Sequence, residues 1–204
     1  MQKIVLASNN KGKIKEFQEI FKNLNIEIIP QEEFNVPEID EPFTTFFENS
    51  LHKARHCSKL TKLPSLADDS GLCVNALNSE PGIYSARYAG IPKSDTKNIA
   101  KLLAALKDTQ DRSAYFYCCL VLVNSADDPS PSFADGRCYG EITLEPRGTN
   151  GFGYDPVFYI KKYQKTTAEL TPEIKNQISH RGLALQNLFN QLLLNKSYAE
   201  KIYK

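Results

Sequence analysis

The pattern of apolar and polar residues predicts a strand, a loop and a helix at the start of the chain. Residues 3–8 form a short apolar run, which is typical of a strand, and the polar residues 9–12 interrupt it. Apolar side chains then recur at helical spacing, at Ile14, Phe17, Ile20, Phe21 and Leu24. A second helix is expected from residue 44 or 45 to residue 60, because Phe47, Leu51 and Ala54 fall on one face.

Strands and helices continue to alternate along the rest of the chain. A third helix, capped by Ser94 or Asp95, is expected to carry the apolar stripe Ile99, Leu102, Leu103 and Leu106. Residues 114–123 predict a central strand, since they are apolar on both faces, and residues 138–144 and 157–160 predict two more. Thr171 and Pro172 are typical of the start of a helix over 172–178, and a last helix follows residues 180–182. The sequence therefore predicts an α/β fold, a mixed sheet covered by helices, in one domain over residues 1–204.

Composition and charge limit the class of partner and the compartment. The chain has 25 basic and 24 acidic residues, a net charge of +1, so it lacks the basic surface of proteins that follow a nucleic-acid backbone. Its five cysteines show no C-x-x-C spacing, which indicates reduced structural thiols. The first apolar run is too short for a signal peptide, and no segment is apolar enough to span a membrane. We therefore expect a cytoplasmic protein with a small-molecule partner, and neither a nucleic-acid nor a membrane partner.

The loop after the first strand is a candidate phosphate site. It consists of Ser8, Asn9, Asn10, Lys11, Gly12 and Lys13. Loop amides and the N-terminus of the next helix can bind phosphate oxygens, and a lysine adds positive charge. The loop is not a Walker motif, and a solvated turn remains the alternative.

The adjacent carboxylates in Asp68-Asp69-Ser70-Gly71 form a second candidate site, predicted at a strand end or turn. Two like charges beside apolar segments need a cation or hydrogen-bond donors, and a divalent ion would satisfy both. Together, Glu41 and Asp69 would give Mg²⁺ the one or two carboxylates that it usually takes. The alternative is an Asx-turn with solvated aspartates.

Two further motifs offer groups that can recognise a base. In the glycine-framed motif at residues 150–156, Phe152 offers a flat face for stacking, and Asp155 can accept hydrogen bonds from ring N–H groups. Donors on Lys175, His180 or Arg181 could bind a carbonyl of the base. A structural turn and an ordinary helix-end charge cluster are the alternatives.

Six motifs in this order resemble the inosine triphosphate pyrophosphatase family, the pyrophosphatases of noncanonical purine nucleoside triphosphates, over nearly the whole chain. They are residues 8–16, Phe46-x-Glu48-Asn49, residues 66–72, Pro81-Gly82-Ile83-Tyr84-Ser85-Ala86-Arg87-Tyr88, Gly151-Phe152-Gly153-Tyr154-Asp155-Pro156 and Ser179-His180-Arg181-Gly182. The resemblance implies two lobes with a central substrate cleft, a homodimer, and release of pyrophosphate and a nucleoside monophosphate from inosine, deoxyinosine or xanthosine triphosphate.

The resemblance also implies a role for each candidate residue. Residues 8–13 would bind the triphosphate, Glu41 and Asp69 would be Mg²⁺ ligands, and Asp69 would also accept the proton. Substrate would contact Lys53 and Ser70. The base would be recognised by Phe152, Gly153, Tyr154, Asp155, Lys175, His180 and Arg181.

Three other functions are weighed against this one. The Maf-like pyrophosphatases share the opening strand but expect an arginine soon after the serine, where this chain has lysines. A nucleotide-binding regulator without catalysis would not need Glu41, Asp68 and Asp69. A nucleic-acid-binding module is disfavoured by the balanced charge.

Overall fold

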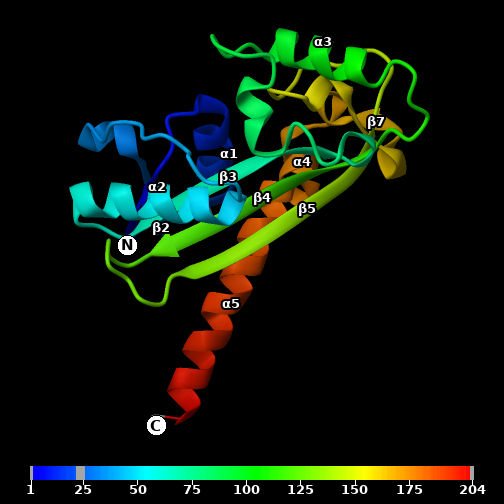
Figure 1. The fold of residues 1–204 in the computed structure, drawn as a ribbon. Helices are drawn as coiled ribbons and strands as arrows, with labels where there is room; N and C mark the ends of the chain where they lie inside the picture. Colours follow the sequence, from blue (N-terminus) through cyan, green and yellow to red (C-terminus); the bar gives the residue numbers. More distant parts are fainter. Residues whose placement is uncertain (1, 22–25, 203–204) are drawn as a thin grey trace. The chain divides into compact units, whose positions relative to one another are not determined.

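The computed structural model describes residues 2–21 and 26–202, which form a mixed sheet with helices. The strands pair in the order β2-β1-β3-β4-β5-β6-β7 (Figure 1). Their bounds are β1 Gln2–Leu6, β2 Ile26–Pro30, β3 Ser65–Val74, β4 Ser113–Val123, β5 Ser132–Ile142, β6 Phe158–Ile160 and β7 Lys165–Thr166. Strand β1 is parallel to β2 and β3, whereas β6 is antiparallel to β5 and β7. The predicted α/β class and mixed sheet are confirmed.

The chain divides into two compact units. Unit 1 comprises Met1–Asp69, Cys118–Gly136 and Arg181–Lys204, and unit 2 comprises Ser70–Tyr117 and Arg137–His180. Each of β3, β4 and β5 contributes residues to both units. The single domain over residues 1–204 and the substrate cleft stay predictions.

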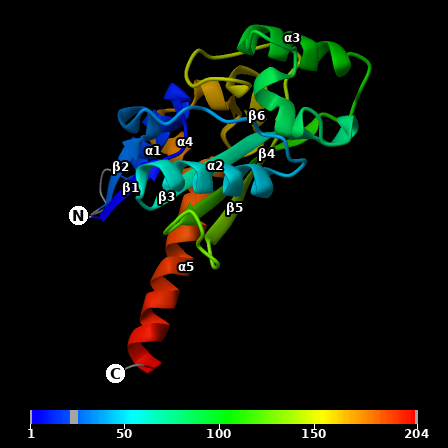
Figure 2. The same ribbon diagram turned by 60° about the vertical axis from the view of Figure 1, so that its left-hand side comes forward.

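In unit 1, helices cover both faces of the strands. The helices are α1 (Lys11–Phe21), α2 (Phe46–Thr61) and α5 (His180–Ile202). Helices α1 and α5 share a core with β1, β3 and β4 that includes Phe17, Leu66, Leu120 and Leu185. On the other face lies α2, whose Ser50 hydroxyl donates a hydrogen bond to the carbonyl of Cys119 at 2.8 Å (Figures 1 and 2).

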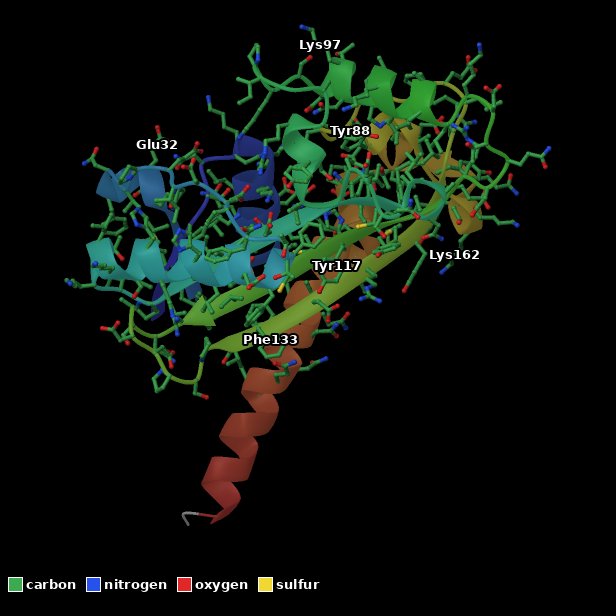
Figure 3. The ribbon with its side chains drawn as sticks, viewed as in Figure 1. Glu32, Tyr88, Lys97, Tyr117, Phe133 and Lys162 are labelled. Atoms are coloured by element: carbon green, nitrogen blue, oxygen red, sulfur yellow. The ribbon has the colours of Figure 1, made fainter. Side chains whose placement is uncertain are left out.

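The second helix shows how local sequence fixes an element. Thr45 caps α2 by accepting a hydrogen bond from the N–H of Glu48, so the helix begins at Phe46, within two residues of the expected start. Phe47, expected on the apolar face, is 36% exposed. Its ring packs edge-to-face against that of Phe133, with the ring centroids 5.2 Å apart (Figure 3 labels Phe133). The buried face of α2 instead carries small and polar residues, Asn49, Ser50, Ala54, Cys57 and Ser58.

Unit 2 is built from α3 (Asp95–Ala105), α4 (Pro172–Ile178) and short 3-10 turns, which include η3 (Gly82–Arg87) and η4 (Asp155–Val157). Its core joins Leu72 of β3 to Leu102 of α3 and Phe158 of β6. Ser94 caps α3 and Thr171 caps α4, and Pro172 is the first residue of α4, as predicted. No helix among the described residues has the length and apolar run that a bilayer span requires.

Several expectations are corrected by the structure. The acidic pair lies neither at a strand end nor in a turn but inside β3, because the apolar segments on either side continue through it as one strand. Strand β5 begins at Ser132 rather than at residue 138, and the short strands β2 and β7 were not expected. The last helix already begins at His180. Leu24, expected on the first helix, lies outside the described residues.

Candidate active site

Parallel pairing of β1 with β3 brings the phosphate-loop candidate beside the acidic pair. The two strands pair at Leu6 and Leu66, and the N–H of Ala7 donates to the carbonyl of Leu66 at 2.8 Å. Strand β1 ends there, while β3 continues into Asp68 and Asp69. Ligands of α/β sheets bind beyond the carboxyl ends of such strands. The loop that follows β1 therefore lies where a ligand of such a sheet is expected to bind.

Asp68 is the more enclosed of the two aspartates and is held by cations. The residue is 1% exposed, and Lys13 Nζ lies 2.9 Å from its Oδ1 and Arg181 Nε 3.2 Å from its Oδ2. Arg181 also donates from Nη1 to Glu16 on α1. Burial alone would raise the pKa of Asp68, but Lys13 and Arg181 outweigh it and hold that pKa well below its usual range. Asp68 is therefore an anchor that stays ionised.

Asp69 has a different environment, although it is the next residue on the strand. Its Oδ2 accepts a hydrogen bond from Asn49 Nδ2 at 3.2 Å, and Lys53 Nζ lies 3.8 Å from Oδ1. Burial raises the pKa of Asp69, and the negative charges of Glu41 and Asp68 add to that effect, so the pKa is raised in spite of Lys53. A carboxylate whose pKa is raised is a better proton acceptor than an ordinary carboxylate. The two neighbouring aspartates thus have opposite pKa shifts, because their partners differ.

Lys53 lies between the two carboxylates that the resemblance assigns to magnesium. Its Nζ is 2.5 Å from Glu41 Oε1 and 3.8 Å from Asp69 Oδ1, and it donates to the carbonyl of Asp68 at 2.8 Å. Burial opposes its charge, but Asp69 and Glu41 outweigh this and raise the pKa of Lys53. The side chains of Glu41 and Asp69 therefore both lie near the ammonium group of Lys53.

The same two carboxylates have the oxygen donors that Mg²⁺ prefers. No group of three or more His, Cys, Asp or Glu side chains could hold a metal ion by itself in the part of the chain that the structure describes. Mg²⁺ needs no such group, because it is commonly bound by one or two carboxylates together with water and substrate phosphates. Glu41 and Asp69 supply that hard-oxygen set.

The loop at residues 8–13 is held in shape by its own side chains. The N–H of Asn10 donates to Ser8 Oγ at 3.2 Å, and the N–H of Lys13 donates to Asn10 Oδ1 at 3.1 Å. Asn9 Oδ1 accepts from Gln31 Nε2 at 3.0 Å. Because α1 begins at Lys11, the loop ends in helical N–H groups and the positive end of the helix dipole, which favour an anion.

In unit 2, the glycine-framed loop brings Phe152, Asp155 and Lys175 together. Lys175 Nζ lies 2.6 Å from Asp155 Oδ2 and 5.0 Å from the centre of the Phe152 ring. The N–H of Phe152 donates to the same oxygen at 2.9 Å, and Thr167 Oγ1 donates to Asp155 Oδ1 at 2.8 Å. Both oxygens of Asp155 therefore have protein donors, so this residue fixes the ammonium group beside the ring. A side chain at Gly151 would meet Asp155, and its φ of 80° also favours glycine.

A model of the Ham1 family matches residues 4–191. The chain belongs to the Ham1 family. It is 54% identical over 190 residues to the "dITP/XTP pyrophosphatase" of Coxiella burnetii. The matched residues cover 92% of this chain and 95% of that protein. This chain is 55% identical over 193 residues to a protein of the same name from Burkholderia pseudomallei, covering 93% of each.

Solved Ham1 structures have the same fold. A HAM1 protein from Coxiella burnetii matches with a TM-score of 0.88 at 53% identity, covering 95% of this chain and 99% of that one. The Ham1 protein of Staphylococcus aureus matches with a TM-score of 0.83 at 45% identity, covering 96% and 100%. The predicted family resemblance is thereby confirmed.

Other expected site residues of this Ham1-family chain lie as follows. Ser70 is half-buried on β3, directly after Asp69. His180 is buried, and its ring stacks on Phe116 with the centroids 4.8 Å apart. Arg181, grouped with the base-recognition residues by the resemblance, has two of its nitrogens on Asp68 and Glu16. The structure thus links Arg181 directly to the acidic pair.

Three residues that bind members of the candidate site have no role in the sequence-based prediction. Glu16 binds Arg181, Asn49 binds Asp69, and Thr167 binds Asp155. The helical pattern contains a signal for Glu16 and Asn49, because each is a polar residue on the buried face of its helix. Thr167 has no such signal, since it lies in a short 3-10 turn far along the chain from its partner's motif.

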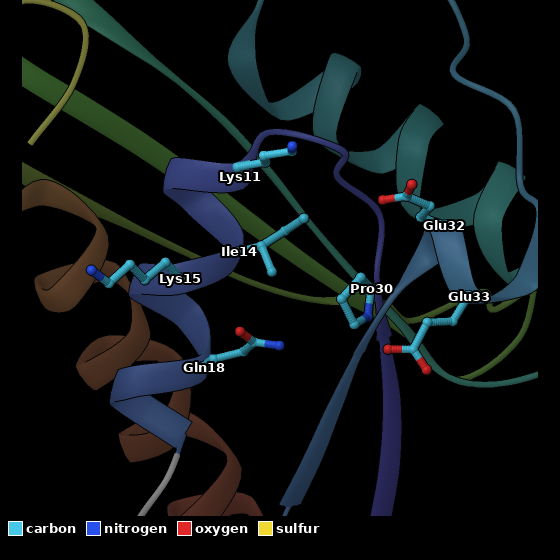
Figure 4. A pocket seen from close by; sticks show the side chains of 7 residues that line it. All are labelled: Lys11, Ile14, Lys15, Gln18, Pro30, Glu32 and Glu33. Atoms are coloured by element: carbon cyan, nitrogen blue, oxygen red, sulfur yellow. The ribbon is translucent and has the colours of Figure 1, made fainter.

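A groove of about 350 Å³ lies between α1 and the end of β2 (Figure 4). Its lining residues are Lys11, Ile14, Lys15, Gln18, Pro30, Glu32 and Glu33. Lys11 belongs to the loop at residues 8–13, whereas the carboxylates Glu41, Asp68 and Asp69 do not line this groove.

Proposed function

We propose that this chain hydrolyses noncanonical purine nucleoside triphosphates to the nucleoside monophosphate and pyrophosphate. The substrates are inosine, deoxyinosine and xanthosine triphosphate, which the enzyme would remove from the nucleotide pool before they enter DNA or RNA. The observation that carries the proposal is the contrast between Asp68, whose pKa is lowered, and Asp69, whose pKa is raised. A nearby pair with opposite shifts is typical of an anchor and a general base. The names of the Ham1 relatives support the substrate class.

In the proposed reaction, water attacks the α-phosphorus and pyrophosphate leaves. Asp69 orients this water and accepts its proton, which the raised pKa favours. The loop at residues 8–13 binds the triphosphate, while Lys13 and Lys53 offset its negative charge. Magnesium, held by Glu41 and Asp69, would supply further charge neutralisation on the phosphate oxygens.

The base would be selected by a ring face and a buried ammonium group. Phe152 offers the stacking face, and Lys175, fixed by Asp155 beside that ring, donates to the 6-carbonyl of hypoxanthine or xanthine. Adenine has an amino group at that position, which cannot accept this hydrogen bond, and a site built on such a bond discriminates strongly.

Replacing Lys175 by Met is expected to reduce the preference for inosine over adenosine triphosphate by roughly 10-fold or more, because it removes this donor. The measurement is the ratio of kcat/KM for the two substrates, in which a general loss of folded enzyme cancels. Lys162→Met is the matched control, since Lys162 is an exposed lysine of the same unit (Figure 3). An unchanged ratio in Lys175→Met would remove Lys175 from base selection.

The cellular setting follows the same proposal. We place the protein in the cytoplasm, as a homodimer whose only substrate is a small molecule, without nucleic-acid or membrane partners. All five cysteines are free and buried, which suits a reducing compartment.

The bond that is cleaved can be identified from the products. With inosine triphosphate and Mg²⁺, phosphorus NMR is expected to show inosine monophosphate and pyrophosphate in equal amounts, and a chelator should stop their release. Inosine diphosphate with orthophosphate would contradict the proposed bond. Undiminished activity in the chelator would contradict the proposed metal.

A further inference from the structure

The turn η3 carries the motif at residues 81–88, which has no part in the proposed reaction. One residue of this turn, Ser85, makes hydrogen bonds to two separate segments that belong to the proposed site. Both segments and the turn lie in unit 2.

The hydroxyl of Ser85 holds the segment of β3 that follows Asp69. Its Oγ accepts a hydrogen bond from the N–H of Leu72 at 2.9 Å and donates to the carbonyl of Gly82 at 2.6 Å. Gly71 lets the turn approach, because a Cβ there would lie 2.2 Å from the Gly82 oxygen and 2.6 Å from Ser85 Oγ. Leu72 is fully buried, so no water can replace the hydroxyl as acceptor for its N–H.

The carbonyl of Ser85 holds the loop that carries Phe152. It accepts a hydrogen bond from the hydroxyl of Tyr154 at 2.9 Å and a second from Asn98 Nδ2 at 3.3 Å. The side chain of Tyr154 is 4% exposed. Its hydroxyl therefore points into the core and ties the base loop to the turn.

We infer that Ser85 is a positioning residue for the reaction, which ties the β3 segment after Asp69 and Ser70 to the loop that carries Phe152. The inference rests on the proposed substrate contacts of Ser70 and Phe152, which both lie in unit 2. A substrate that contacts Ser70 and stacks its base on Phe152 needs these two groups at a fixed separation, because errors near 1 Å in such positions cost roughly 10²-fold in rate. Ser85 bonds to the segments on both sides of that separation.

The test compares Ser85→Ala and Tyr154→Phe with wild type in kcat and KM for inosine and adenosine triphosphate. Ser85→Ala frees the strand and is expected to lower kcat for inosine triphosphate by roughly 10-fold with little change in KM. Tyr154→Phe removes only the hydroxyl that binds Ser85, and is expected to lower the preference for inosine by several-fold. Ser85→Thr keeps the hydroxyl and should recover most of kcat.

Ser113→Ala is the matched control for lost stability. Ser113 Oγ also accepts one hydrogen bond, from Asn75 Nδ2, and donates one, to Asp111, in the same unit. Its removal is expected to change the melting temperature without changing kcat or base preference.

The outcomes separate the inference from the function on which it rests. If wild type releases pyrophosphate and both test variants stay within about 2-fold of Ser113→Ala, the positioning role is overturned. If Ser85→Ala does not fold, Tyr154→Phe decides alone, and an unchanged base preference overturns the inference. An inactive wild type would overturn the proposed function itself.

Discussion

Asp69→Asn is expected to lower kcat by about 100-fold or more while KM changes little. Asparagine keeps the size and the contact with Asn49 but cannot accept a proton from water. The raised pKa of Asp69 supports its proposed role as the base, whereas Asp68 is held ionised by Lys13 and Arg181. Steady-state release of pyrophosphate from inosine triphosphate measures the effect.

The control for this variant is Asp127→Asn. Asp127 also belongs to an adjacent aspartate pair, but it is exposed in the loop between β4 and β5. Its replacement should leave kcat unchanged. Near-normal turnover of a folded Asp69→Asn enzyme would refute Asp69 as the base.

Arg181→Leu is expected to lower the free energy of unfolding by about 3–5 kcal/mol, the usual cost of removing one partner of a buried ion pair. Arg181 is 1% exposed, and its loss leaves the carboxylates of Asp68 and Glu16 without that cation. Urea denaturation at neutral pH measures the difference. A loss below about 1 kcal/mol would show that the contacts of Arg181 add little to stability.

The same variant has an expected pH dependence. The folded-state pKa of Asp68 is lowered, so its ionisation stabilises the fold above the ordinary carboxyl pKa of about 4, and this contribution is lost as pH falls further. Without Arg181 the pKa of Asp68 is lowered less, so its ionisation contributes less stability that can be lost at low pH. The stability gap between wild type and Arg181→Leu should therefore narrow below about pH 4, and a widening gap would contradict this linkage.

Capping residues and the spacing of apolar residues predicted helices α3 and α4 correctly. Thr171 and Pro172 marked the start of α4, and the spacing of Ile99, Leu102 and Leu106 marked α3. The short strand β2 was missed, because Glu27 and Pro30 interrupt its apolar residues and its strand form depends on pairing with β1.

The sequence predicted which residue types form the candidate site better than it predicted their contacts. The acidic pair was found as a motif, but its placement inside β3 depends on cations that only the fold supplies. Arg181 and Glu16 are 165 residues apart, and no local pattern reports such a pairing. The different environments of Asp68 and Asp69 arise from these distant partners, so the sequence alone could not assign Asp68 the role of an anchor.

The central claim is tested most directly by pyrophosphate release from a panel of nucleoside triphosphates with Mg²⁺. Inosine, deoxyinosine and xanthosine triphosphate should be cleaved with kcat/KM values above those for adenosine and guanosine triphosphate and the pyrimidine triphosphates, by on the order of 10²-fold or more. Equal cleavage of the whole panel, or none of the three noncanonical purines, would contradict the proposed function.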